Sequence, residues 1–179
     1  MKRSMLILIL SFIVVATSVN SQGLLEKYPD VLAYKEKIDK DTTLRPITLE
    51  NDEFLEHIDH GGELIGYYKD SVIVKATTTL YYSHGVEKVN YYLADSKVRH
   101  LLFMEESFDM YPYNEETGEF EYSKAYRNFY GQYVFKDDKL IDQISTGHNR
   151  FEDDTINIRQ TVYSELVYYL DIITLKNAL

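Results

Sequence analysis

Hydrophobic residues recur along the chain at two spacings, which separates extended segments from helical ones. In the middle of the chain, four segments rich in Val, Ile, Thr, Tyr and Phe are joined by links of only two or three residues. These segments cover residues 63–69, 72–82, 86–94 and 98–106. Links this short connect antiparallel neighbours. A further pair, 125–136 and 140–146, meets at an Asp-Asp turn. The pattern therefore predicts an antiparallel meander of about six strands.

Apolar residues at helical spacing flank this strand-rich region on both sides. Residues 24–40 are typical of a helix interrupted by Pro29. The end of the chain carries an apolar stripe with intervals of three or four residues, formed by Ile158, Val162, Leu166, Tyr169 and Ile173. Asp154 or Thr155 can cap this final helix. We expect both helices to pack on one face of the sheet, which gives an α+β domain.

The first 21 residues have the layout of a secretory signal peptide. A short basic start precedes an apolar run over residues 5–16, which is shorter than the ~20 residues that span a bilayer. Val19 and Ser21 are small residues placed for a cut before Gln22. We therefore expect residues 1–21 to be removed. The remaining single α+β domain, residues 22–179, would work in the periplasm or outside the cell.

Net charge and the absence of cysteine limit the kinds of partner and chemistry that we expect. Cleavage would remove two of the 19 basic residues and none of the 29 acidic ones, so the net charge would change from −10 to −12. An acidic surface repels phosphate groups, so we expect no nucleic-acid partner. The chain has no cysteine, which excludes disulfides and thiolate chemistry and favours a bacterial exported protein. No second apolar run approaches spanning length, so we predict no stable membrane insertion after cleavage.

A turn signature recurs within the strand-rich region. Residues 91–98, Tyr-Tyr-Leu-Ala-Asp-Ser-Lys-Val, match residues 133–140, Tyr-Val-Phe-Lys-Asp-Asp-Lys-Leu, position for position. Hairpins of this form after an export signal resemble those of functionally uncharacterised secreted proteins of Bacteroidota-type bacteria, over roughly residues 63–146. The resemblance implies a fold type and carries over no catalytic residue.

The clearest candidate for metal chemistry precedes Gly61-Gly62. On a helix, Glu53, Glu56, His57 and His60 would share one side, at i, i+3, i+4 and i+7. Two imidazoles and a carboxylate can bind zinc and leave one position open. A polar, solvated helix end is the alternative interpretation, because no His-Glu-x-x-His motif is present. No other motif marks a nucleophile or a general acid, so we assign no catalytic residue and predict no cofactor.

Tyrosine is the most unusual feature of the composition. The chain has 17 Tyr, no Trp and four Tyr-Tyr doublets. Adjacent strand residues point to opposite faces, so a doublet in a strand sends one ring to each side of the sheet. Unless both faces are covered, one of them should display tyrosines, and we predict binding roles for Tyr68, Tyr82 and Tyr92. Alternatively, tyrosine is simply a good strand former.

These features favour an exported, non-enzymatic binding protein that uses a tyrosine-rich sheet face. Tyrosine combines apolar area with a hydroxyl, which suits a protein or glycan partner. Two alternatives stay open. One is a metal- or carboxylate-dependent hydrolase, since adjacent acidic pairs such as Glu105-Glu106 could serve glycoside hydrolysis. The other is a structural component of the cell envelope.

Overall fold

The computed structural model describes residues 23–55, 59–94, 101–137, 139–148, 150–151, 153 and 155–179. It begins with two short helices, α1 (Gly23–Glu26) and α2 (Pro29–Lys40), and ends with the long helix α3 (Ile158–Asn177). Seven strands form the main sheet: β1 (Arg45–Glu50), β2 (Gly62–Lys69), β3 (Val72–Tyr82), β4 (Gly85–Leu93), β5 (Leu101–Met110), β8 (Tyr126–Lys136) and β9 (Lys139–Gly147).

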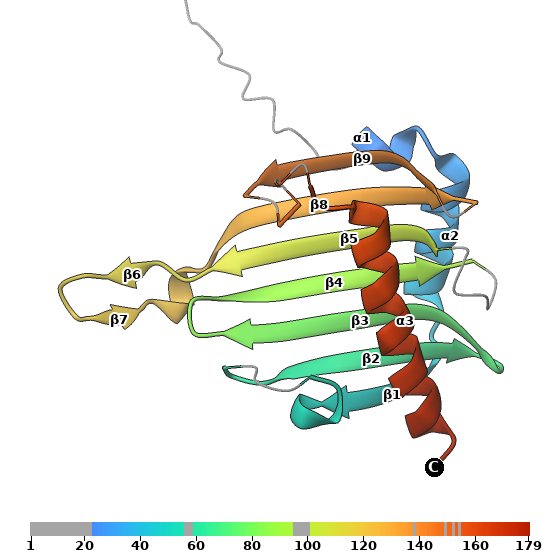
Figure 1. Cartoon of the computed structure of the whole chain (residues 1–179), viewed down its shortest axis with the longest axis horizontal. Helices are drawn as coiled ribbons and strands as arrows, with labels where there is room; N and C mark the ends of the chain where they lie inside the picture. The colour runs from blue at the N-terminus through green and yellow to red at the C-terminus, as the bar shows by residue number, and fades with distance from the viewer. Residues whose placement is uncertain are drawn as a thin grey trace, which may run out of the picture.

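Four smaller elements complete the described part of the fold. Strands β6 (Tyr113–Asn114) and β7 (Glu119–Phe120) form a hairpin that projects beyond one end of the main sheet (Figure 1). Two short 3-10 helices, η1 (Asn51–Glu53) and η2 (Tyr122–Lys124), follow β1 and β7. The predicted signal peptide and cleavage site lie outside the described residues.

The strand order is β1-β2-β3-β4-β5-β8-β9, and every neighbouring pair is antiparallel. The predicted α+β class and antiparallel meander are therefore confirmed. The sheet has seven strands rather than about six, because residues 45–50 form the additional edge strand β1. Pro46 fits there, since an edge strand has one side on which a missing N–H costs no hydrogen bond.

The helices pack on opposite faces of the sheet, whereas the sequence analysis placed both on one face (Figure 1). Helix α3 packs in the same core as Tyr91 and Tyr133, while α1 and α2 pack in the core that contains Tyr92 and Val134. These neighbouring residues are all at most 2% exposed. Strands with consecutive buried residues need cover on both faces, and one helix on each face provides it.

Helices α1 and α2 cover only one end of their face. The sheet residues in their core include Val74, Tyr92 and Phe103, which lie where the strands pass beneath α2. Farther along β8, the same face carries Tyr130, which is half-buried. The candidate functional site lies at the boundary between the covered and uncovered parts of this face.

Helix α3 approaches β2 closely at a glycine. A β-carbon at Gly66 would lie 2.5 Å from Cγ2 of Ile173. Ile173 is completely buried in the core beneath α3. The close contact between helix and sheet therefore depends on the missing side chain at position 66.

A partly buried ion-pair cluster joins α3 to β5. Arg150, which follows β9, donates from Nε to Glu106 at 3.0 Å and from Nη1 and Nη2 to Glu165 of α3 at 2.6 and 2.9 Å. The Glu106 side chain is 3% exposed. Burial raises its pKa to about 7, with Arg150 opposing the shift and Glu87 and Glu165 adding to it. The described residues give Glu106 Oε2 no hydrogen-bond partner.

We expect Gly66→Val to destabilise the protein by about 1–3 kcal/mol, because the added side chain overlaps Ile173. Valine is a good strand former, so without this contact the change would be tolerated. Urea unfolding measures the loss. Ile173→Ala should lower the free energy of unfolding by less in the Gly66→Val chain than in the natural one. If the two substitutions lower it additively, the side chains are not in contact.

The raised pKa of Glu106 predicts how stability depends on pH. The ordinary pKa of a glutamate carboxyl is 4.5, against about 7 for Glu106 in the folded protein, so the folded state binds the proton more tightly. This contribution to stability is complete below the lower pKa and is lost as pH rises through the higher one. Glu106→Gln removes the buried charge and keeps an acceptor for Arg150, so it should stabilise the protein by roughly 1–3 kcal/mol near pH 8.

Thermal unfolding across this pH range tests the prediction. Glu119→Gln, on the exposed hairpin strand β7, is the matched control. It should leave the dependence of the unfolding temperature on pH unchanged. If Glu106→Gln also leaves the profile unchanged, the buried carboxyl is not the group that titrates.

Candidate functional site

A pocket of about 420 Å³ opens where α1 and α2 meet the uncovered part of the sheet. Its volume falls within the range of roughly 300–1,000 Å³ that is typical of small-molecule sites. The residues that line it are Leu25, Glu26, Leu32, Lys35, Glu36, Glu105, Tyr130 and Gln132. The helices supply one wall, and β5 and β8 supply the floor.

Strand register and helix periodicity bring these residues together. Glu105 of β5 and Gln132 of β8 are direct cross-strand partners. Tyr130 lies two residues before Gln132, so strand alternation places it on the same face. On α2, Leu32 and Lys35 are three residues apart and therefore lie on one side of the helix.

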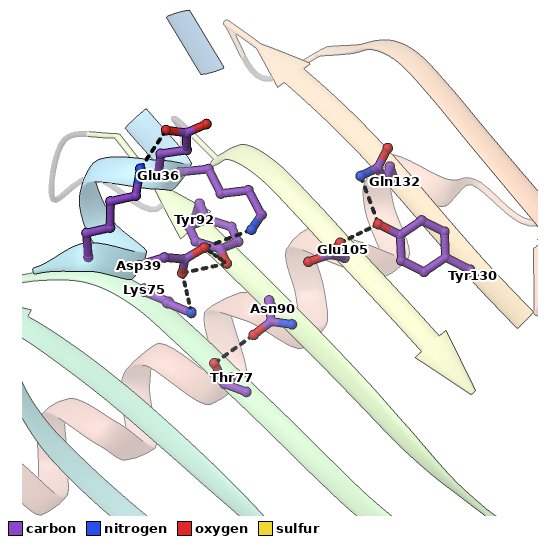
Figure 2. A network of polar contacts seen from close by, with 11 residues as sticks. Glu36, Asp39, Lys75, Thr77, Asn90, Tyr92, Glu105, Tyr130 and Gln132 are labelled. Atoms are coloured by element: carbon purple, nitrogen blue, oxygen red, sulfur yellow. Dashed lines mark hydrogen bonds and ion pairs between the residues drawn. The ribbon is translucent and has the colours of Figure 1, made fainter. Parts of the chain in front are cut away.

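The pocket floor is a chain of polar side chains (Figure 2). The Tyr130 hydroxyl donates to Oε1 of Glu105 and accepts a hydrogen bond of 2.8 Å from Nε2 of Gln132. Gln132 is only 3% exposed, and its Oε1 has no hydrogen-bond partner among the described residues. A buried acceptor without a donor costs about 1–3 kcal/mol, so this amide is arranged at a cost to stability.

A second network fixes α2 to the sheet beside the pocket (Figure 2). Asp39 accepts from Nζ of Lys35 and of Lys75, each at 2.7 Å, and from the Tyr92 hydroxyl at 2.9 Å. Burial alone would raise the pKa of the Asp39 carboxyl, but these three hydrogen bonds outweigh it and hold the pKa below its usual value. The wall that carries Lys35 is therefore anchored through a charge-assisted network.

The ionic groups around the pocket do not balance. Lys35 and Lys75 share Asp39, and Lys40 pairs with Glu36 at 2.9 Å. Glu26 and Glu105 have no cationic partner within the described residues. Four carboxylates therefore face three ammonium groups, and the uncompensated carboxylate on the floor is Glu105.

The predicted tyrosine face is contradicted by the burial of its members. Tyr68 and Tyr92 are 4% and 2% exposed, and they belong to different cores. Tyr82 is half-buried against the core beneath α3, and its hydroxyl donates to Glu87 at 3.3 Å. The three rings therefore share no exposed face.

The turn between β3 and β4 explains this error. Tyr82 pairs with Gly85 across the turn, and cross-strand partners point to the same face. Odd-numbered residues of β4 therefore lie on the Tyr82 face, so Tyr82 shares a face with Tyr91, and Tyr92 points to the other one.

The most exposed tyrosines of the described chain lie on and beside the β6–β7 hairpin. Tyr113, Tyr122 and Tyr126 are 57%, 61% and 49% exposed. Ring contacts order this projection, with centroids 4.9 Å apart for Tyr111 and Tyr122 and 5.2 Å apart for Tyr113 and Phe120. Exposed tyrosine is therefore concentrated in a segment that the sequence analysis left aside.

The predicted zinc site is only partly described. Glu56 and His57 lie outside the described residues, so the zinc hypothesis stays a prediction. Glu53 accepts the backbone N–H of Glu50 at 3.0 Å and pairs with Lys176 of α3, while His60 is exposed. In the part of the chain that is described, no group of three or more His, Cys, Asp or Glu residues could hold a metal ion.

Sequence reasoning missed the pocket floor. Glu105 entered only as one of several acidic pairs, and Tyr130 and Gln132 were not considered. A usable signal exists, because Gln132 is the one amide or charged residue in the run from Phe129 to Phe135, two positions from Tyr130. That pattern predicts polar side chains gathered on one sheet face.

No helix among the described residues is long and apolar enough to cross a membrane. Comparisons of the chain with protein-family models, curated proteins and solved structures find no match. The geometry of the site is therefore the basis for a functional proposal.

Proposed function

We propose that this chain is an exported, non-enzymatic binding protein whose pocket between α2 and the β5–β8 floor holds a small hydroxyl-rich ligand of the glycan class. The observation that carries the proposal is the buried Oε1 of Gln132, which lacks a protein donor among the described residues although Gln132 lines the pocket. Because this oxygen is itself fully buried, a ligand hydroxyl supplies the missing donor when the amide turns toward the pocket.

The rest of the lining suits the same ligand class. Glu105 accepts hydrogen bonds from hydroxyl groups, and Lys35 can donate to ligand oxygens. Leu25, Leu32 and the ring of Tyr130 offer apolar area to the C–H groups of a sugar ring. The remaining lining residues are charged or carry an amide, so the pocket is more polar than most small-molecule sites and suits a hydroxyl-rich ligand.

Recognition is favoured over hydrolysis by the residue types that line the pocket. The described lining holds no Ser, Cys or His that could serve as a nucleophile or as a partner base. Its floor carboxylate, Glu105, already accepts the hydroxyl of Tyr130. The acidic groups therefore act as hydrogen-bond acceptors.

Gln132→Leu tests the proposal. Leucine fills a similar volume and removes both the unpartnered acceptor and the hydrogen bond from Nε2 to Tyr130, so the two effects offset and stability should change by less than about 1 kcal/mol. Affinity for any saccharide selected from a panel of mono- and oligosaccharides by NMR titration should fall at least about tenfold. Loss of binding without loss of stability distinguishes a ligand contact from a structural one.

Gln143→Leu is the matched control for this experiment. Gln143 is exposed on the neighbouring strand β9 and pairs with Tyr133, which faces the core beneath α3. The Gln143→Leu variant should bind the selected saccharide with unchanged affinity. If no saccharide of the panel binds the natural protein, or if both variants bind equally well, the proposed function is wrong.

Export predicts a defined mature N-terminus. We expect the protein recovered outside the cytoplasm to begin at Gln22, with a mass that lacks residues 1–21. Intact-mass spectrometry measures this directly. Leu8→Arg interrupts the apolar run and should retain the full-length chain in the cytoplasm. An uncleaved natural protein in the cytoplasmic fraction would contradict the export proposal.

A further inference from the structure

We infer that the ligand of this pocket carries a protonated amine beside its hydroxyl groups, as in the amino sugar and amino alcohol class, and that the ammonium pairs with Glu105. This inference rests on the proposed function and names the ligand class more narrowly.

The floor offers acceptors that the described protein groups leave unfilled. Tyr130 occupies Oε1 of Glu105, and Oε2 accepts no hydrogen bond from the described residues. Its cross-strand partner Gln132 adds the buried acceptor Oε1. A hydroxyl offers one donor, whereas an ammonium group offers three. An ammonium bound at Oε2 of Glu105 therefore keeps further donors for other oxygens of the site.

An uncompensated negative charge remains on the floor. The lysines near the pocket are already engaged, since Lys35 and Lys75 bind Asp39 and Lys40 binds Glu36. Glu105 is half-buried and has no cationic partner in the described structure. A partly buried carboxylate is stabilised by an opposite charge at hydrogen-bond distance. A ligand ammonium provides that charge.

Contacts among the protein's own side chains hold the floor in place before a ligand arrives. Arg127 lies over the ring of Tyr130, 5.4 Å from its centroid, and is itself paired with Asp109 at 2.8 Å. Tyr130 in turn is hydrogen-bonded to Glu105 and Gln132. These contacts orient both acceptors, so binding an ammonium needs little reordering of the site.

Calorimetric titration of the mature domain with glucosamine, N-acetylglucosamine and glucose tests the inference. The three sugars share a ring, and only glucosamine carries a charged amine. At about pH 6, below the pKa expected of such an amine (~7.7 for an α-amino group), glucosamine should bind at least about tenfold tighter than the other two. Its advantage should shrink at high salt, as an ionic contact requires.

Two further measurements assign the preference to Glu105. Glu105→Gln keeps an acceptor for Tyr130 and removes the charge, so the three sugars should then bind within about threefold of one another. Glu119→Gln, at an exposed position of β7, should leave the preference intact. With the natural protein, raising the pH above the pKa of the amine should abolish the preference, a result that does not depend on how any variant folds.

The possible failures separate the two proposals. If glucose or N-acetylglucosamine binds as tightly as glucosamine, the amine inference is wrong and the glycan-binding proposal stands. The inference also fails if ethylamine binds as tightly as glucosamine, because the hydroxyl groups then contribute nothing. If none of the sugars binds, the proposed function itself is contradicted.

Discussion

Side chains of a β-strand alternate between two faces, so a strand with consecutive buried residues must be covered on both sides. Tyr91 and Tyr92 on β4, and Tyr133 and Val134 on β8, impose this requirement at one end of the sheet. One long helix covers the first face, and a short helical unit covers part of the second. The pocket lies at the edge of that shorter cover, so its position follows from how far the consecutive burial extends along the strands.

Anchoring the short unit requires more than apolar contact, because α2 has only 12 residues. Asp39 provides the anchor by accepting hydrogen bonds from Lys75 and Tyr92 of the sheet. Hydrogen bonds to a charged group contribute about 1.5–3 kcal/mol, more than those between neutral groups. The same carboxylate binds Lys35, so the contact that fixes the helix also holds a lining residue of the pocket.

Sequence patterns predicted those features that depend on local spacing. Links of two or three residues identified the antiparallel meander, and the apolar stripe identified α3. Face assignment was less successful, because it depends on register: β-bulges occur opposite Tyr67/Tyr68 and Tyr92/Leu93, and the β3–β4 turn pairs Tyr82 with Gly85. Each bulge changes which neighbours share a face. The candidate site was missed for a similar reason, since Glu105 and Gln132 are 27 positions apart and meet only through the β5–β8 pairing.

The two polar clusters of this domain show how burial has different consequences on its two faces. Beneath α3, Arg150 connects Glu106 to Glu165, so those groups hold one another and join the helix to the sheet. In the pocket, Glu105 and Gln132 are oriented by Tyr130, yet neither has a cationic partner among the described residues. A fold gains stability by satisfying its buried polar groups, and it gains binding capacity by orienting some of them without satisfying them. Glu106 Oε2 also lacks a hydrogen-bond partner among the described residues, but it lies beneath α3, whereas Glu105 and Gln132 line a pocket, and the binding proposal therefore rests on the second cluster.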